Sequence, residues 1–276
     1  MKCFISADME GLAATASWKE FESDYQRLRR LFTAEVKAVC DGILASGVKV
    51  SSIVVCDAHG SGENLLIEDL PEPVLVARGS GRPLMMMHGL DSSFDLVYFV
   101  GYHSGAGVPE SQMDHTYSAR SFYRVRFNGT EMDEAMINAA LAGFYRVPVG
   151  FASGDDKFVR HARKVFPGIE TVATKYAVSR FAAVARHPKP VLRELEQKAA
   201  KAAQRAREFK PYSVGKGAVR MELQMATTAH ADMVALIPGA RQTDGRTVFF
   251  RCPNAREAYR TLRLAAILAG SATAYL

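Results

Sequence analysis

The sequence lacks the features that would place it in a membrane or outside the cell. It has no run of the roughly 20 apolar residues that a helix needs to cross a bilayer. Its opening, Met1–Asp8, reaches an acidic residue too early to form the apolar core of a secretory signal. The four cysteines show no Cys-x-x-Cys spacing, and Cys3 and Cys56 lie in apolar runs, which favours buried free thiols over disulfides. We therefore expect a cytoplasmic protein with no membrane segment.

Signals for binding nucleotides or nucleic acids are also scarce. The chain carries no Walker or dinucleotide-binding fingerprint. Arg78–Arg82 places two arginines around flexible backbone and would suit a phosphate, although such a segment is more often a mobile surface loop. Residues 191–276 hold 14 basic and 7 acidic side chains, against 9 and 14 in residues 1–100. Because the basic stretch has few aromatic residues and no nucleic-acid motif, we expect no nucleic-acid partner.

Hydrophobic periodicity predicts a layered α/β fold. Apolar strands alternate with helices over the first 190 residues, which indicates a mostly parallel sheet covered by helices. The breaker His187–Pro190 precedes a second pattern, which predicts a smaller α+β domain. We expect domains at residues 1–190 and 191–276. The strands are predicted at residues 2–7, 50–56, 73–77, 96–101, 122–127, 147–152, 218–225 and 247–252, and the helices at 23–46, 130–144, 155–166, 191–210, 228–236 and 254–269.

Polar residues concentrate where the predicted strands end. Asp8, His59 and His103 each lie at or just after the end of a strand, and Glu10 follows Asp8 by two positions. Ligands bind beyond the carboxyl ends of the strands in open parallel sheets. Two carboxylates and two imidazoles form a set that suits a divalent metal, zinc especially. Taken singly, each residue is more often a helix cap or a hydrogen-bonded polar group, so the prediction depends on their convergence.

The residues at these positions resemble a known family. Ser6–Gly11 is similar to the opening Ser-x-Asp-x-Glu-Gly signature of the zinc-dependent D-aminopeptidases of the DppA-like type. The resemblance continues in order along the chain through Asp57–His59, Gly101–His103, Met113–His115, Glu134 with Asn138–Ala139, Gly154–Asp156, Lys175 with Ser179–Arg180, and the helix at 254–268.

The resemblance implies a metallo-aminopeptidase that uses a pair of zinc ions to release N-terminal D-amino acids from short peptides. The metal ligands would be Asp8, Glu10, His59, His103 and Glu134. His115 would be catalytic, as a nucleophile or as a group that moves protons. Thr130–Asp133 has the form of a capping box, which would leave Glu134 free to face the sheet. Five ligands suffice for two metals if Asp8 bridges them.

The resemblance also implies a ring-like homo-oligomer with enclosed sites. A related dinuclear amidase that acts on non-peptide or amino-acid amides is the alternative function. A nucleotide-binding protein that uses Arg78–Arg82 and a metal-stabilised structural subunit are alternatives from other classes. Lys175 and Arg180 would meet a substrate carboxylate or an oxyanion, or else form salt bridges, whereas His161, His187 and His230 are assigned no role.

Overall fold

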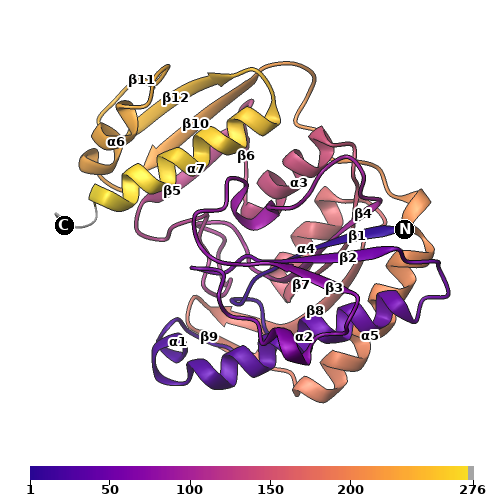
Figure 1. Cartoon of the computed structure of the whole chain (residues 1–276). Helices are drawn as coiled ribbons and strands as arrows, with labels where there is room; N and C mark the ends of the chain where they lie inside the picture. The colour runs from indigo at the N-terminus through magenta and orange to yellow at the C-terminus, as the bar shows by residue number, and fades with distance from the viewer. Residues whose placement is uncertain (273–276) are drawn as a thin grey trace.

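The computed structural model describes residues 1–272 and contains two β-sheets (Figure 1). The first sheet has seven strands in the order β3-β2-β1-β4-β7-β8-β9, and only β9 runs antiparallel to its neighbour. Its strands are β1 (Lys2–Ala7), β2 (Ser52–Asp57), β3 (Val74–Ala77), β4 (Leu96–Tyr102), β7 (Val149–Asp155), β8 (Glu170–Ser179) and β9 (Ala182–Ala185).

Helices cover both faces of this sheet. The central strands β1, β4 and β7 are almost entirely buried, as expected of parallel strands that have helices on each side. Figure 1 shows α2 and α5 side by side beneath the sheet, with α3 and α4 on the other side. The helices are α1 (Lys19–Ser23), α2 (Tyr25–Leu44), α3 (Glu134–Phe144), α4 (Asp156–Val165), α5 (Pro188–Gln204), α6 (Thr228–Ala235) and α7 (Ala255–Ala272), with short 3₁₀ turns η1 (Ile67–Asp69), η2 (Met85–Met87) and η3 (Ala206–Glu208).

The second sheet is antiparallel and has five strands in the order β11-β12-β10-β5-β6. One core links it to the first sheet, because α7 packs on β12 and also contacts α3. Its strands are β5 (Phe122–Phe127), β6 (Thr130–Glu131), β10 (Val219–Met225), β11 (Arg241–Gln242) and β12 (Thr247–Cys252).

The predicted fold class is confirmed: a mostly parallel sheet layered with helices, together with a smaller antiparallel unit. The division into residues 1–190 and 191–276 stays a prediction. The second sheet contains strands from both segments, since β5, which pairs with β6, also pairs with β10. Helix α5 packs against α2 and the first sheet.

Two local predictions were wrong. Residues 130–144 do not form one helix, because Thr130–Glu131 pairs with β5 and the helix begins only at Glu134. The strand β8 and the hairpin that it forms with β9 were missed. A lysine in the middle of β8 interrupts the apolar pattern that would have indicated a strand.

Within residues 1–272, no helix combines the length and apolar character that a membrane span requires. The four cysteines are free and buried.

Helix α5 is attached to the sheet by close backbone packing and by a cluster of charges. A Cβ atom at Gly42 of α2 would lie 2.1 Å from the Glu196 carbonyl oxygen, so the two helices approach at a position that only glycine permits. Glu170, at the start of β8, is 4% exposed and pairs with Lys198 at 3.0 Å, with Lys201 at 3.1 Å and with Arg205. Burial opposes the charge of Glu170, but the three cations outweigh it and lower the pKa of its carboxyl.

Glu170→Gln should lower the free energy of unfolding at neutral pH by about 1–2 kcal/mol, because three partly exposed cations lose their charged partner. A lowered pKa stabilises the fold above the unfolded pKa of about 4.3, and this contribution is lost as the pH falls through the folded pKa. The difference from wild type should therefore shrink in acid. Denaturant titrations at pH 7 and below pH 4 measure it, with the exposed Glu196→Gln as control. An equal difference at both pH values would contradict this account.

Candidate metal centre

The three strand ends that carry Asp8, His59 and His103 are neighbours in the sheet. Strand β1 lies between β2 and β4, and all three run parallel. The Asp8 amide donates to the Val100 carbonyl, which carries the chain across the end of β4. The order of the strands therefore brings Asp8, His59 and His103 together, as the sequence prediction required.

The turn after β1 is held against β4 at a distance that excludes side chains. The Gly11 amide donates to the Gly101 carbonyl at 2.7 Å. A Cβ atom at Gly11 would lie 2.1 Å from the Tyr102 carbonyl oxygen. Gly101 has φ of +69°, and its Cβ would meet the Asp8 carbonyl oxygen. These contacts place Asp8 and Glu10 directly beside the end of β4.

One half of the cluster joins Asp8, Glu10 and His59. The His59 Nδ1 atom lies 3.1 Å from Asp8 Oδ1 and 3.0 Å from Glu10 Oε2. The Phe21 ring stacks on the imidazole at 4.9 Å between centroids, and Trp18 donates its indole N–H to Glu10 Oε1. Both carboxylates are 3% exposed, so they depend on these partners rather than on water.

The other half joins Asp8, His103 and Glu134. His103 Nε2 lies 3.6 Å from Asp8 Oδ2 and 3.5 Å from Glu134 Oε1. Its Nδ1 atom is 2.9 Å from the Ser104 carbonyl oxygen, an acceptor, so Nδ1 carries a proton. Burial opposes a charge on this ring, but Glu134, Glu10 and Asp8 outweigh burial and raise the pKa of His103 to about 10, so the ring is a cation whose Nε2 faces two carboxylates. No hydrogen-bond partner reaches this buried atom among residues 1–272.

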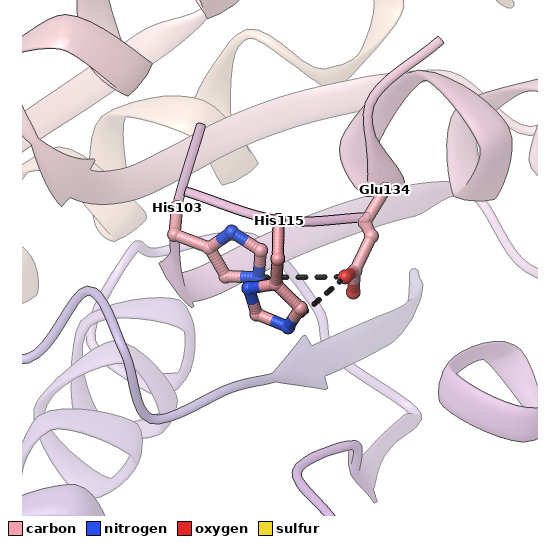
Figure 2. A group of neighbouring side chains, drawn as sticks. All are labelled: His103, His115 and Glu134. Carbon is pink, nitrogen blue, oxygen red and sulfur yellow. Dashed lines mark ion pairs between the residues drawn. The ribbon is translucent and has the colours of Figure 1, made fainter. Parts of the chain in front are cut away.

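His115 lies in the same cluster (Figure 2). Its ring stacks on His103 at 4.0 Å between centroids, and its Nε2 lies 3.6 Å from Glu134 Oε1. The Nδ1 atom donates to the Met113 carbonyl, and Trp18 packs edge-on against the ring. The imidazole is thus fixed on two sides with Nε2 facing the carboxylates.

Glu134 reaches the cluster from the first turn of α3. Asp133, not Thr130, is the N-cap, since its side chain accepts from the Met136 amide; the predicted capping box was wrong in this respect. The Tyr117 amide donates to Glu134 Oε1 at 2.6 Å. Asp133 also pairs with His161 at 3.1 Å, a contact that the sequence analysis missed because the two residues are distant in the chain.

Burial and mutual charge shift the pKa values throughout the cluster. Burial, reinforced by the charge of Glu10, raises the pKa of Asp8 to about 7. Burial opposes the charge of Glu10, but His59 outweighs burial and lowers the pKa of this carboxyl. Burial likewise opposes the charge of Glu134, but His103 outweighs it and lowers the pKa of Glu134. Burial and the charge of His103 lower the pKa of His115, which favours its neutral form.

The donor set fits zinc. Three buried carboxylates face imidazole nitrogens, and His103 Nε2, which makes no hydrogen bond, would give up its proton to bind a metal cation held by the same carboxylates. Ligand atoms of Asp8, Glu10 and His103 lie within 4.8 Å of one another, as do those of His103, His115 and Glu134. Two overlapping groups that share His103 are compatible with one metal or with two neighbouring ones.

The structure brings together all six residues proposed from the sequence, whereas Lys175 and Arg180 contact the segments around the cluster and not its carboxylates. Arg180 lies 3.5 Å from Asp114 and packs over Trp18, which matches the salt-bridge alternative. The Lys175 ammonium is fully buried and donates to the Glu10 carbonyl at 2.5 Å and to the Thr15 hydroxyl at 2.7 Å. It therefore holds the turn that carries Glu10.

A buried polar network connects β1, β4 and α3, which carry or adjoin the cluster, to α7. Asn138 of α3 donates to the Tyr102 hydroxyl at 2.8 Å and accepts from Tyr259 of α7 at 2.9 Å. The Tyr102 hydroxyl also lies 2.6 Å from Ser6 Oγ in β1. The network fixes α7 relative to the end of the first sheet, so residues on α7 can line the site.

A cavity of about 360 Å³ opens over the cluster. This volume is near the lower end of the range for small-molecule sites, about 300–1,000 Å³. The cluster supplies its polar wall through Asp8, Glu10, His59, His115 and Glu134. The rest of the wall comes from the segment after β3, from η2 and from α7: Ser80, Gly81, Arg82, Met85, Met86, Arg263 and Ala266.

The comparison with protein families decides the class. Residues 1–264 match the family model described as D-aminopeptidase. The chain belongs to the D-aminopeptidase family. A D-aminopeptidase of Bacillus subtilis (strain 168) is 32% identical over an alignment of 269 positions that covers 95% of this chain and 95% of that protein. A solved structure described as the zinc-dependent D-aminopeptidase DppA from Bacillus subtilis, a self-compartmentalizing protease, has a TM-score of 0.93 and 30% identity, and the match covers 98% of both chains.

Family membership confirms the resemblance noted in the sequence and the enzyme class that it implied, an aminopeptidase. The assignment of the five metal ligands and of His115 stays a prediction for this D-aminopeptidase family member. The geometry above supplies its physical basis.

Lys175→Met should lower the zinc affinity about 10–100-fold, because the turn that carries Glu10 loses the donor that fixes its backbone. Competition with a chromogenic chelator measures the affinity. The control is Lys157→Met, since Lys157 is on α4 and its ammonium pairs with Glu110 and Asp156. Unchanged zinc affinity in a folded Lys175→Met protein would show that the turn does not need this lysine.

Proposed function

We propose that this protein is a zinc-dependent aminopeptidase that releases N-terminal D-amino acids from short peptides at a dinuclear metal site. The observation that carries the proposal is the set of three buried carboxylates and three imidazoles beside one small cavity, with His103 Nε2 directed at Asp8 and Glu134. We propose the preference for D-residues because the matching family is described as D-aminopeptidase, and we propose zinc because the similar solved structure is described as zinc-dependent.

Asp8, Glu10, His59, His103 and Glu134 would hold the two ions. Asp8 is the central ligand, because Oδ1 faces His59 and Oδ2 faces His103. This arrangement supports a bridging carboxylate between two metals. When bound, zinc supplies Lewis-acid polarisation of a peptide carbonyl and makes water a better nucleophile at neutral pH.

His115 is suited to move protons during hydrolysis. Its Nδ1 carries a proton that is donated to the Met113 carbonyl, so Nε2 is the free base in the neutral ring. A lowered pKa keeps this base available near pH 7. His115 Nε2 takes a proton from the attacking water and gives it to the leaving amine, which balances the cleavage of one peptide bond by one water.

The assembly proposed for this chain is a ring-like homo-oligomer. The hairpin of β8 and β9 exposes apolar side chains at its tip and outer face, with Tyr176, Val178, Phe181 and Val184 each at least 50% exposed. Contiguous exposed apolar groups mark interaction surfaces. Val178→Asp should therefore lower the mass of the assembly measured by light scattering, and an unchanged mass would exclude the hairpin from the interface.

A cytoplasmic location stays a prediction, supported by four free cysteines.

The function is tested by elemental analysis of the purified protein together with turnover of aminoacyl p-nitroanilides and short D- and L-peptides. Two zinc ions per chain with release of N-terminal D-residues supports the proposal. Turnover of simple amides without peptide cleavage would favour the dinuclear amidase instead. Absence of both metal and turnover would contradict the proposal.

Asp8→Ala should reduce bound zinc from two ions to one or none and abolish hydrolysis, because the carboxylate between the two halves of the cluster is lost. Elemental analysis after dialysis measures the metal. Asp41→Ala is the matched control, since Asp41 pairs with Lys37 on the surface of α2. Two retained ions with full activity in Asp8→Ala would end the dinuclear hypothesis.

His115→Ala should keep both zinc ions and lose about 10²–10⁴-fold in kcat, the usual contribution of general acid–base catalysis. Steady-state kinetics with parallel metal analysis gives both readouts. His187→Asn, which retains a cap acceptor at the start of α5, serves as control for loss of a histidine elsewhere. Loss of zinc in His115→Ala would make His115 a ligand, and normal turnover would remove it from the mechanism.

A further inference from the structure

Two guanidinium groups line the cavity beside the carboxylate–imidazole cluster. Arg82 comes from the segment after β3 and Arg263 from α7, so residues 181 positions apart meet at one wall. Arg263 Nη1 donates to the Arg82 carbonyl, which ties the helix to the segment. The two positive groups are therefore positioned together by the fold.

Arg82 is almost completely buried, and contacts with the backbone around it hold it in place. It is 9% exposed, and its Nη1 donates to the Ala77 carbonyl at 3.2 Å. Its guanidinium lies so close to Gly62 that a Cβ there would approach Nη1 to 2.4 Å. The Gly79 amide donates to the Gly62 carbonyl, which joins this segment to the loop that carries His59. Arg82 is thus fixed relative to the carboxylate–imidazole cluster.

Neither guanidinium has an anionic partner. Within the described part of the chain, residues 1–272, no carboxylate lies within 4.0 Å of Arg82 or Arg263, and the buried Nε of Arg82 makes no hydrogen bond. Each guanidinium has five N–H donors, and Arg82 and Arg263 each use one for a backbone carbonyl. A buried guanidinium without a counter-charge is costly, which is typical of a group that meets an anion from a ligand.

The geometry points to a carboxylate clamp: Arg82 and Arg263 bind the free C-terminal carboxylate of a peptide whose N-terminal residue lies at the metal cluster. This inference rests on the proposed function and specifies its substrate class. A carboxylate matches the forked guanidinium donors, and both partners are charged. Because the cavity that contains both groups is only about 360 Å³, the clamp selects peptides of a few residues with an unblocked C terminus.

The apolar part of the lining suits the rest of such a peptide. Met85, Met86 and Ala266 contribute apolar surface to the same cavity. Methionine side chains adapt to ligands of different shape. The cavity therefore combines a hydrolytic end, a flexible apolar wall and an anion-binding end.

The test compares D-alanyl-D-alanine with D-alanyl-D-alaninamide, which differ only in the C-terminal charge. Wild type should cleave the acid with a kcat/KM about 10–100-fold above that of the amide, mainly through KM. Arg263→Met and Arg82→Met should bring this ratio close to one. The control Arg260→Met, on the exposed side of α7 where Arg260 pairs with Glu257, should keep the wild-type ratio.

The remaining outcomes separate the clamp from the function. If wild type and Arg263→Met show the same ratio of kcat/KM for the acid to kcat/KM for the amide, the clamp is overturned but the proposed aminopeptidase activity is not. Wild type that cleaves neither would overturn both. Tight binding of a nucleoside monophosphate by calorimetry, lost in Arg263→Met, without preference for the free carboxylate would show that the arginines bind phosphate instead. Arg263 is only half-buried, so its variant tests the clamp even if Arg82→Met does not fold.

Discussion

Three carboxylates held away from water at one edge of a parallel sheet are the constraint on which the rest of this structure depends. Asp8, Glu10 and Glu134 are each no more than 4% exposed. Buried like charges repel one another and lose their hydration, so they persist only where positive or hydrogen-bonding groups compensate them. His59, His103 and His115 supply part of this compensation, and a divalent metal pair would supply the rest.

The surrounding fold holds these carboxylates in place against that repulsion. The glycine contacts at positions 11 and 101 press the turn after β1 onto β4, and Lys175 binds the same turn from β8. The N-cap Asp133 fixes the first turn of α3, from which Glu134 projects. Each support acts on the backbone of a segment that carries a proposed metal ligand, so the scaffold itself defines the positions of these side chains.

The same scaffold explains why the site has two different ends. Strand order in the first sheet assembles the carboxylates and imidazoles, whereas α7 and the segment after β3 contribute Arg82 and Arg263. The Asn138 network joins these parts through Tyr102 and Tyr259. Groups of opposite charge therefore line one small cavity, which is an arrangement suited to a short zwitterionic molecule.

Much of the site could be predicted from the sequence because it follows from local patterns. Apolar runs that end in Asp8, His59 and His103 identify strand ends, and parallel strands bring such ends together. Lys175 could not be placed in this way, because its partners in residues 10–15 become neighbours only through the order of β1, β4, β7 and β8. The start of α3 was misplaced since Thr130 and Asp133 are both good caps, and pairing of Thr130 with β5 decides between them.

The meeting of Arg82 with Arg263 carries no local signal either. Arg82 lies in a loop after β3 of the first sheet, and Arg263 lies on a helix that packs on the second sheet; the glycine at position 62 that accommodates Arg82 lies in a third segment. Contacts of this kind depend on tertiary packing rather than on periodicity.

The central claim is that the cluster holds two zinc ions through Asp8, Glu10, His59, His103 and Glu134. Anomalous diffraction at the zinc absorption edge, on crystals of the zinc-loaded protein, tests it most directly. The account predicts two peaks within coordination distance of these five side chains, with Asp8 next to both. A single peak, or two peaks that leave Asp8 outside the coordination sphere, would contradict it.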